Sequence, residues 1–561
     1  MGRLEAELTW SLSDPGMGLL ERAGLAALYM SLRAAEERQV DLSPLQWDES
    51  DLAVDSVTIR SGADLESAIA RLFEWAWQVT EGVLYLPAVH RDHKARDNAF
   101  LRVPTHNGIM RTFLQHPRVQ PKGDLAQHVV QLDEDCHVAF AFQPVEPSRL
   151  KPITDLERSR FFTKEGAPSD EEVSLSGWVF PGIAPRYGRE VAWKGPPSMG
   201  MLLMLAPITC LYQQLHNQRG TWLYVVPDVR DLEEFDAIRV SPSFGLDPTY
   251  TDVASLGDAG LRFLAEYTSH PARREIGGGC RVVAMGKVGY YQSQSIRKGV
   301  VDVDIATART AIRRYKILHA TMRNRWTKRK AETDSAKGQK PKSPKPKDEN
   351  GTTASHFVAV PTARGRIADN LAEGRPWYSD LGCPLAWDRE ALDRQRKNRP
   401  GVSIERLWFN NFLYQRGRLM ELIDQEEMWD SPAERLFVEA FWQILASLYR
   451  READAVERGG SRTFGDRVED LNEDIRRRLT RAKTRPLLRE AIADLFAKPV
   501  RKYRSPAVRE HPAAMWRLID DDWKRARDLG LLALASYQSK ENRDKAGDDD
   551  TTSPQQEGVE E

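Results

Sequence analysis

The sequence predicts an α+β body over residues 1–330, with a mixed and irregular sheet, followed by an all-α helical bundle over residues 403–540. In the first part, strand-like alternation mixes with helical periods, and no regular strand–helix–strand repeat occurs. From Ser403 onward, helical periods dominate and β-branched residues become rare. Residues 331–354 contain almost nothing apolar, which predicts a disordered basic linker, and residues 355–402 then form a connecting segment.

The elements of the body follow from the period of their apolar residues. Apolar residues three or four positions apart predict helices at 17–37, 63–79, 200–216 and 256–269. Alternation or short apolar runs predict strands at 3–11, 54–59, 82–87, 129–143 (two strands around a turn), 221–226, 281–288, 300–305 and 356–360. The basic stretch 90–122 and the polar stretch 290–298 are expected to be loops.

The bundle has one strong helix-start signal. Ser431 is expected to cap a helix, Pro432 to occupy its first position and Glu434 to close a capping box. Comparable helices are expected at 403–427, 464–482, 486–497 and 512–538. The stretch 541–561, here called the acidic tail, has eight acidic and two basic residues, so disorder is expected.

Composition excludes several classes of protein. Hydrophobic residues make up 41% of the 561 residues and charged residues 29%, which is typical of a soluble protein with large cores. No apolar run is long enough to span a membrane, and no secretory signal opens the chain. The four cysteines lie far apart, without a CxxC motif, which favours a reducing, cytoplasmic location.

A search for catalytic motifs finds none with a convincing context. His90-Arg91-Asp92 resembles a kinase catalytic loop, but the other kinase motifs are missing. His90, Asp92 and His93 match no common zinc spacing, so surface histidines in a basic loop are expected instead. We therefore expect no enzymatic activity, no metal and no cofactor.

Positive charge is concentrated in one segment although the formal net charge is only −1. Residues 309–330 carry nine basic side chains and no acidic one. Apolar residues such as Ile312, Tyr315 and Leu318 are interleaved at helical spacing, which predicts a packed helix with one basic face. Such a face is typical of a protein that binds a phosphate backbone. The predicted phosphate contacts here are Arg309, Arg313, Arg314, Lys316, Arg323 and Arg325.

Further polar and basic residues complete the predicted nucleic-acid site. Asn and Gln beside Arg and Lys are the residue types that read base edges, so Asn107, Gln292 and Gln294 are predicted to contact bases. The residues predicted to contact the phosphates next to these bases are Arg102, Lys194, Arg297 and Lys298. In the bundle, phosphate contacts are predicted at Arg477, Arg478, Arg481 and Arg485. The alternative for these bundle arginines is pairing within the helix with Glu469, Asp470, Glu473 and Asp474.

The order of these parts resembles a known family. The strand at 3–11 is followed by Asp14-Pro15-Gly16-Met17-Gly18-Leu19-Leu20-Glu21-Arg22-Ala23-Gly24-Leu25-Ala26-Ala27-Leu28-Tyr29. This opening, with the basic insert and the helical bundle, resembles the large subunit of type I CRISPR effector complexes (Cascade). The specific resemblance is to the Myxan or developmental-locus branch, which is grouped with types I-A and I-B.

The resemblance implies a non-catalytic, DNA- and RNA-binding subunit of an antiviral surveillance complex. Such a subunit would recognise the short motif that flanks the target in duplex DNA, help to form the R-loop and recruit a helicase-nuclease. Implied partners are the CRISPR guide RNA, double-stranded target DNA, the handle-binding and backbone Cascade subunits and the small subunit, which the helical bundle resembles. A stand-alone nucleic-acid-binding regulator, a nuclease with an unrecognised active site and a structural scaffold remain open as alternatives.

Overall fold

The computed structural model describes residues 6–537 apart from several gaps. The gaps are 62–63, 92–94, 116–124, 132–136, 148–149, 159–160, 164–168, 180, 182–192, 217–219, 242–250, 275–276, 289–290, 329–355, 381–415, 459–462 and 498–511. The predicted linker at 331–354 and the acidic tail therefore lie outside the described residues, as does most of the predicted helix at 403–427.

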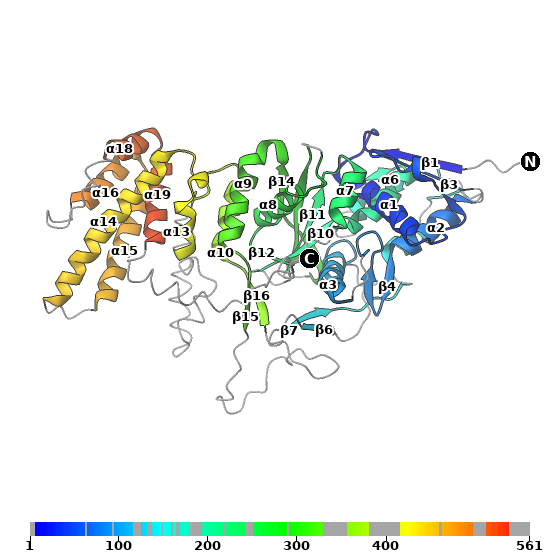
Figure 1. Ribbon diagram of the computed structural model, residues 1–561, viewed down its shortest axis with the longest axis horizontal. Coiled ribbons are helices and arrows are strands. Elements are labelled where there is room, and N and C mark those ends of the chain that lie inside the picture. Colours follow the sequence, from blue (N-terminus) through cyan, green and yellow to red (C-terminus); the bar gives the residue numbers. More distant parts are fainter. Residues whose placement is uncertain are drawn as a thin grey trace, which may run out of the picture. The chain divides into compact units, whose positions relative to one another are not determined.

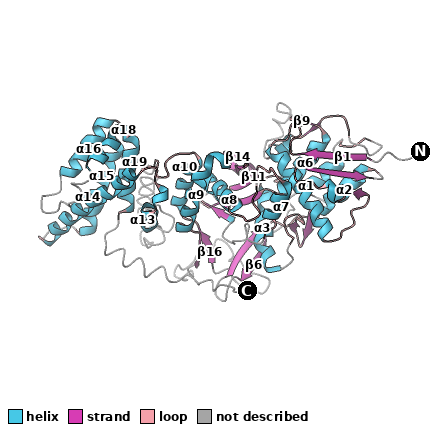
Figure 2. Ribbon diagram, turned by 45° about the horizontal axis from the view of Figure 1, so that its top comes forward, coloured by secondary structure: helices cyan, strands magenta, loops and turns pink. Residues whose placement is uncertain are grey.

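The chain forms two compact units. The first comprises Met1–Lys316 and Asn324–Val360, and the second comprises Ile317–Arg323 and Pro361–Glu561. The first mixes helices and strands, and the described part of the second is helical. Figure 2 shows this difference by colour. The predicted fold class, an α+β body and an all-α bundle, is confirmed.

The centre of the first unit is a sheet of five strands in the order β12-β10-β11-β13-β14. Their bounds are Asp252–Val253, Leu211–Leu215, Trp222–Pro227, Gly279–Val288 and Tyr291–Asp304. All pairs are antiparallel except β10 with β12. Every residue of β11 is buried, because α1 (Leu19–Glu37), α3 (Ala95–Arg111) and α8 (Leu256–Tyr267) pack against it (Figure 1). The sheet therefore supplies the rigid core of this unit.

Smaller sheets and further helices surround this core. A three-stranded sheet is formed by β1 (Ala6–Ser11), β3 (Ser56–Ser61) and β2 (Leu45–Gln46). Two-stranded sheets are β4–β5 (Gln78–Thr80, Val83–Tyr85), β6–β7 (Ala126–Gln131, His137–Phe142), β8–β9 (Val173–Ser174, Lys194–Gly195) and β15–β16 (Arg325–Lys328, His356–Ala359). The other longer helices are α2 (Leu65–Ala76), α4 (Lys151–Arg158), α6 (Pro197–Leu205), α7 (Leu232–Arg239) and α9 (Ile305–Thr321).

Two glycines allow close approach between elements of the core. A Cβ atom on Gly24 of α1 would lie 2.0 Å from the carbonyl oxygen of Leu202 in α6. A Cβ atom on Gly108 of α3 would lie 2.2 Å from the Cβ of Tyr212 in β10. Any larger residue would push these elements apart, so both packing contacts depend on glycine.

The second unit packs its helices around aromatic and leucine side chains. Its helices are α10 (Thr362–Ala372), α13 (Arg416–Asp424), α14 (Pro432–Glu457), α15 (Phe464–Arg481), α16 (Arg485–Ala497), α18 (Pro512–Asp521) and α19 (Trp523–Ser536). Helix α14 packs against α15, α18 and α19 and buries Phe437, Phe441 and Leu445. The predicted helix at 512–538 is broken at Asp522, whose side chain accepts a hydrogen bond from the backbone N–H of Arg525 and caps α19.

The start of α14 agrees with the prediction in its position but not in its capping. The helix begins at Pro432 after Ser431, as expected. The capping box is wrong, because the Ser431 side chain makes no capping hydrogen bond. Glu434 instead accepts a hydrogen bond from the backbone N–H of Asp430 and forms an ion pair with Arg525. The tertiary ion pair has taken the place of the local cap.

Three predicted segments of the body differ from the structure. The stretch 90–122, expected to be a loop, contains α3. The stretch 200–216, expected to be helical, ends its helix at Leu205 and continues after a short 3-10 turn as β10. The polar stretch 290–298, expected to be a loop, is strand from Tyr291 onward. In each case, packing in the complete fold overrides the local sequence pattern.

Candidate nucleic-acid interface

Helix α9 has the predicted basic face. Its first turn follows β14 directly, and the Asp304 side chain accepts a hydrogen bond from the backbone N–H of Thr307 at 3.0 Å. Ile312, Tyr315 and Leu318 are buried on one side. The α9 basic stripe, defined here as Arg309, Arg313 and Lys316, is exposed on the other side at spacings of four and three residues. The stripe can therefore meet an extended polyanion along the helix axis.

A buried hydrogen bond fixes the rotation of α9. The Tyr315 hydroxyl donates to Asp258 Oδ1 at 2.6 Å, and both side chains are buried. The backbone N–H of Ala254 donates to the other carboxylate oxygen of Asp258 at 2.8 Å. No local pattern could have revealed this pair, because its members are 57 residues apart. The bond holds the apolar side of α9 against α8 and the stripe outward.

The remaining predicted cations of this region have different surroundings. Arg314 is buried, with only 8% of its surface exposed, so it does not share the face of the stripe. Arg323 is exposed after the end of α9 and belongs to the second compact unit. Arg325 is exposed at the start of β15, in the first unit, where it pairs with Ala359.

The far half of the β13–β14 hairpin extends past the sheet. The pairing of β11 with β13 ends at Met285, opposite Trp222, whereas β13 and β14 remain paired as far as Val288 and Tyr291. We call residues 286–296 of this hairpin the β-arm. Gln292 and Gln294 belong to the β-arm. The structure describes their backbone but not their side chains. Both residues belong to β14, but a second register shift, between the pairs Lys287–Ser295 and Val288–Tyr291, leaves residues 292–294 without a pairing partner on β13.

A bulge marks the base of the β-arm. The register shifts between the pairs Ala284–Gly299 and Met285–Arg297, which leaves Lys298 as the extra residue. Arg297 and Lys298 are both exposed. The Lys298 stem lies against Gly286, since a Cβ atom there would be 2.9 Å from Lys298 Cε. The bulge thus places two adjacent cations where the β-arm leaves the sheet.

Asn107 and Arg102 are engaged in contacts within the body. Asn107 is in α3, not in a loop as expected, and its amide donates to the carbonyl of Ala141 at 2.9 Å. The Arg102 guanidinium lies 5.3 Å from the centre of the Tyr85 ring and donates to the carbonyl of Thr80 at 3.3 Å. Burial lowers the pKa of Arg102 below its usual value. Both residues would have to exchange these contacts in order to bind a nucleic acid.

Lys194 lies in a different setting. It is exposed on the short strand β9, opposite Ser174, and its neighbour Trp193 is 52% exposed. An exposed cation beside an exposed aromatic ring is suited to contact a phosphate and a base or sugar together.

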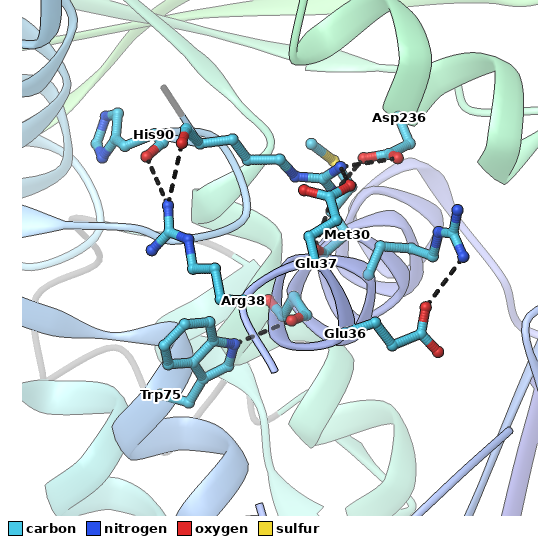
Figure 3. A network of polar contacts seen from close by, with 10 residues as sticks. Met30, Glu36, Glu37, Arg38, Trp75, His90 and Asp236 are labelled. Atoms are coloured by element: carbon cyan, nitrogen blue, oxygen red, sulfur yellow. Dashed lines mark hydrogen bonds and ion pairs between the residues drawn. The ribbon is translucent and has the colours of Figure 1, made fainter. Parts of the chain in front are cut away.

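His90 is part of a buried polar network and not a surface residue, so that expectation was wrong (Figure 3). The neighbouring Arg91 forms ion pairs with Asp236 at 2.6 Å and with Glu37 at 2.7 Å, and also donates to the carbonyl of Met30. Arg38 donates to the carbonyl of His90 at 3.1 Å. These contacts join α1, α7 and the segment before α3, which is a structural role. Asp92 and His93 lie outside the described residues.

Two buried histidines of this region accept hydrogen bonds as neutral rings. His90 Nδ1 accepts from the backbone N–H of Leu86 at 3.0 Å, and burial lowers the pKa of His90 to about 3. His106 Nδ1 accepts from the backbone N–H of Leu84 at 3.2 Å, and its Nε2 lies 2.8 Å from the carbonyl oxygen of Gln143. Burial lowers the pKa of His106 to about 4. Both rings are therefore uncharged at neutral pH.

The bundle arginines divide into two groups. Arg477 and Arg478 form ion pairs on α15, with Glu473 at 3.7 Å and with Asp474 at 2.9 Å, as the alternative interpretation expected. Arg481 is exposed, and Arg485 contacts only the carbonyl of Asp520, at 3.5 Å, among the described residues. Half-exposed ion pairs are weak, so Arg477 and Arg478 can still exchange their partners for phosphates. Phosphate binding by all four stays a prediction.

The described residues contain no group of three or more acidic, His or Cys side chains placed to hold a metal ion. Among the same residues, no helix is long and apolar enough to cross a membrane.

Comparison with known proteins identifies the class. Residues 9–204 match the DevT N-terminal domain, and residues 425–561 match the DevT C-terminal domain. A protein of Myxococcus xanthus (strain DK1622), CRISPR-associated protein Cas8a1/Csx13, is 26% identical over 554 residues, which cover 96% of this chain and 90% of that protein. The predicted resemblance to CRISPR large subunits is confirmed. Within that class, the two matched DevT domains fit the developmental-locus branch.

Proposed function

We propose that this protein is the non-catalytic large subunit of a type I CRISPR effector complex, which acts in the cytoplasm to recognise duplex DNA next to the guide-paired target. The observation that carries the proposal is the exposed α9 basic stripe together with the β-arm, in a chain similar to Cas8a1/Csx13 over nearly its whole length. Its partners would be the guide RNA, the handle-binding and backbone subunits, the small subunit and a recruited helicase-nuclease.

The two surfaces are suited to different tasks. The stripe offers cations at helical spacing, which can hold a phosphate backbone of any sequence. The β-arm carries Gln292 and Gln294 on a two-stranded ribbon, and a two-stranded ribbon fits a DNA groove. Arg297 and Lys298 at its base would hold the flanking phosphates. In this proposal the β-arm reads the flanking motif, and opening of the duplex lets the guide form the R-loop.

Pull-down of the tagged chain from its native host, with sequencing of the RNA that co-purifies, tests the proposal. We expect short RNAs that share one constant 5′ handle and differ in their spacers, together with several partner proteins. A strain that expresses only the tag gives the background. Chain that is recovered without RNA and without partners would contradict the proposal in favour of a stand-alone binder or an enzyme.

A library of target duplexes with randomised flanking bases tests the assignment of base reading. Gln292→Ala and Gln294→Ala in the assembled complex should change which flanks are bound. Gln127→Ala, at an exposed position of the β6–β7 hairpin, serves as the matched control. Equal loss of binding on every flank would show that the β-arm holds DNA without reading it.

A further inference from the structure

The end of α15 and the turn after it form a cluster of cations. Residues 476–485 contain six basic side chains and no acidic one. Arg476 and Arg478 are only partly exposed, and they pair with Glu473 at 2.6 Å and with Asp474 at 2.9 Å. The four exposed side chains form what we call the α15 basic end: Arg477, Arg481, Lys483 and Arg485. Of these, Arg477 also pairs with Glu473, at 3.7 Å.

Helix stability does not account for all of this charge. Cations in the last turn of α15 interact favourably with its dipole, which explains Arg481. Arg485, however, lies in the first turn of α16, where a cation is unfavourable. Among the described residues, neither Arg481 nor Lys483 forms an ion pair. The cluster therefore has the charge and exposure of a binding surface for an anion.

The polypeptide that follows α19 starts close to this surface. The Tyr537 ring lies 5.1 Å from that of Tyr449, and the Tyr449 hydroxyl donates to Asn472 of α15 at 2.6 Å. Arg481 is nine residues further along α15 than Asn472, a rise of about 14 Å. The acidic tail thus begins four residues after a side chain that is packed beside α15.

We infer that the acidic tail docks on the α15 basic end. Asp548, Asp549 and Asp550 follow Tyr537 by 11 to 13 residues, and random-coil linkers of that length span roughly 20 Å on average. This span is longer than the rise of about 14 Å along α15, so it is sufficient to reach the cations. Each ion pair would be weak, but the covalent connection gives the tail an effective concentration of roughly millimolar. Nucleic acid would then have to displace the tail in order to bind. This consequence rests on the proposed function, whereas the docking itself is independent of it.

Zero-length carbodiimide cross-linking of the full chain tests the docking directly. The reagent joins a lysine amine to a carboxylate only where the two are in contact. We expect mass spectrometry to find Lys483 joined to carboxylates of residues 541–561, with at least a several-fold loss of these products in 1 M salt, where screening is strong. Cross-links spread evenly over exposed lysines such as Lys194, Lys298 and Lys316 would overturn the inference.

A pair of matched charge reversals separates specific docking from general attraction. Arg481→Glu removes one cation of the basic end, and Arg458→Glu removes one cation directly after the end of α14. Arg458 is nine residues beyond Tyr449, just as Arg481 is nine residues beyond Asn472, and both are exposed. We expect the Lys483 cross-link to fall several-fold in Arg481→Glu and to remain in Arg458→Glu. An equal effect of the two variants would contradict docking at the α15 end.

A binding measurement then tests displacement. Fluorescence anisotropy with a labelled DNA oligonucleotide at low salt should show roughly tenfold tighter binding when residues 541–561 are deleted, and no such gain in the Arg477→Glu, Arg481→Glu, Lys483→Glu background. A gain of equal size in that background would mean that the tail acts elsewhere, which overturns the inference. If neither form binds DNA while the Lys483 cross-link persists, the docking stands and the proposed function fails.

Discussion

In the interior of the first unit, the hydroxyl of Tyr315 donates a hydrogen bond to the carboxylate of Asp258, at a distance of 2.6 Å. The two residues lie on α9 and α8, and neither side chain is appreciably exposed. Because α9 is held at this point, Arg309, Arg313 and Lys316 cannot rotate inward. A single buried contact thus determines where the basic surface faces.

Loss of this bond should destabilise the first unit. Tyr315→Phe leaves a buried carboxylate with one fewer donor, which should cost about 1.5–3 kcal/mol of the free energy of unfolding. Tyr85→Phe is the control, since the Tyr85 hydroxyl donates to a neutral carbonyl, that of His90, at 3.2 Å. Urea unfolding monitors both variants. A cost for Tyr315→Phe no greater than that for Tyr85→Phe would argue against this role.

Reversal of the α9 basic stripe should weaken DNA binding without regard to sequence. We expect Arg309→Glu, Arg313→Glu and Lys316→Glu together to lower the affinity on every flanking motif. The slope of log K against log salt should fall by about 0.9 for each phosphate that the variant no longer neutralises. Arg71→Glu, on the exposed side of α2, should change neither quantity. Unchanged salt dependence in the triple variant would remove the stripe from the interface.

Glycine at the crossing of α1 and α6 should be indispensable. In Gly24→Ala the new methyl group would overlap the carbonyl oxygen of Leu202, so α1 and α6 must separate, at a cost of roughly 1–3 kcal/mol or more. Gly417→Ala is the matched control within a helix, because among the described residues no atom outside its own helix backbone lies within 4 Å of its added Cβ. That control should stabilise the protein by up to about 1 kcal/mol. Thermal unfolding distinguishes the two, and equal effects would exclude a tight crossing.

Acid should destabilise the protein through its buried histidines. Below pH 6.5 the unfolded chain binds a proton at His90 and at His106, whereas the folded chain does not until the pH nears their lowered pKa values of about 3 and about 4. Stability should therefore fall as the pH drops from 6.5, by about 2 kcal/mol for each histidine at pH 5.

The variant His106→Gln tests this origin of the acid sensitivity. A glutamine can accept from Leu84 and donate to Gln143, but it does not titrate. Unfolding midpoints at pH 7 and pH 5 should differ less in this variant than in the unaltered chain. His128→Gln, at an exposed position, controls for the loss of an imidazole. If the two variants have the same pH dependence, burial of His106 is not its cause.

Much of the fold could be predicted because apolar period and capping residues are local signals. Helices α1, α8 and α15 lie close to their predicted bounds for this reason. Helix α3 was missed because it is buried on several sides: Thr105 and His106 at its polar positions are enclosed, so no polar face marks it as a helix. The strand character of residues 291–298 depends on pairing with β13, which a local pattern does not contain.

The candidate site could be predicted in part. The α9 basic stripe has the predicted period, and its cations are exposed. Sequence could not show that Arg314 is buried or that Asn107 donates to Ala141, because both depend on which side of a helix meets the core. Arg91 forms its ion pairs with Glu37 of α1 and Asp236 of α7, two separate helices. The buried network around His90 therefore had no local signal in the sequence either.

In the β-arm each strand pairs with only one other strand, and this affects the rate of amide hydrogen exchange. Past Met285 the hairpin has no third strand beside it among the described residues, so its amide groups are protected only by the pair itself. An isolated pair of strands is marginally stable in water. Hydrogen exchange at residues 286–288 and 291–296 should therefore occur by local opening at much lower free energy than in β11, and the ribbon can fray and re-form many times while the core stays closed.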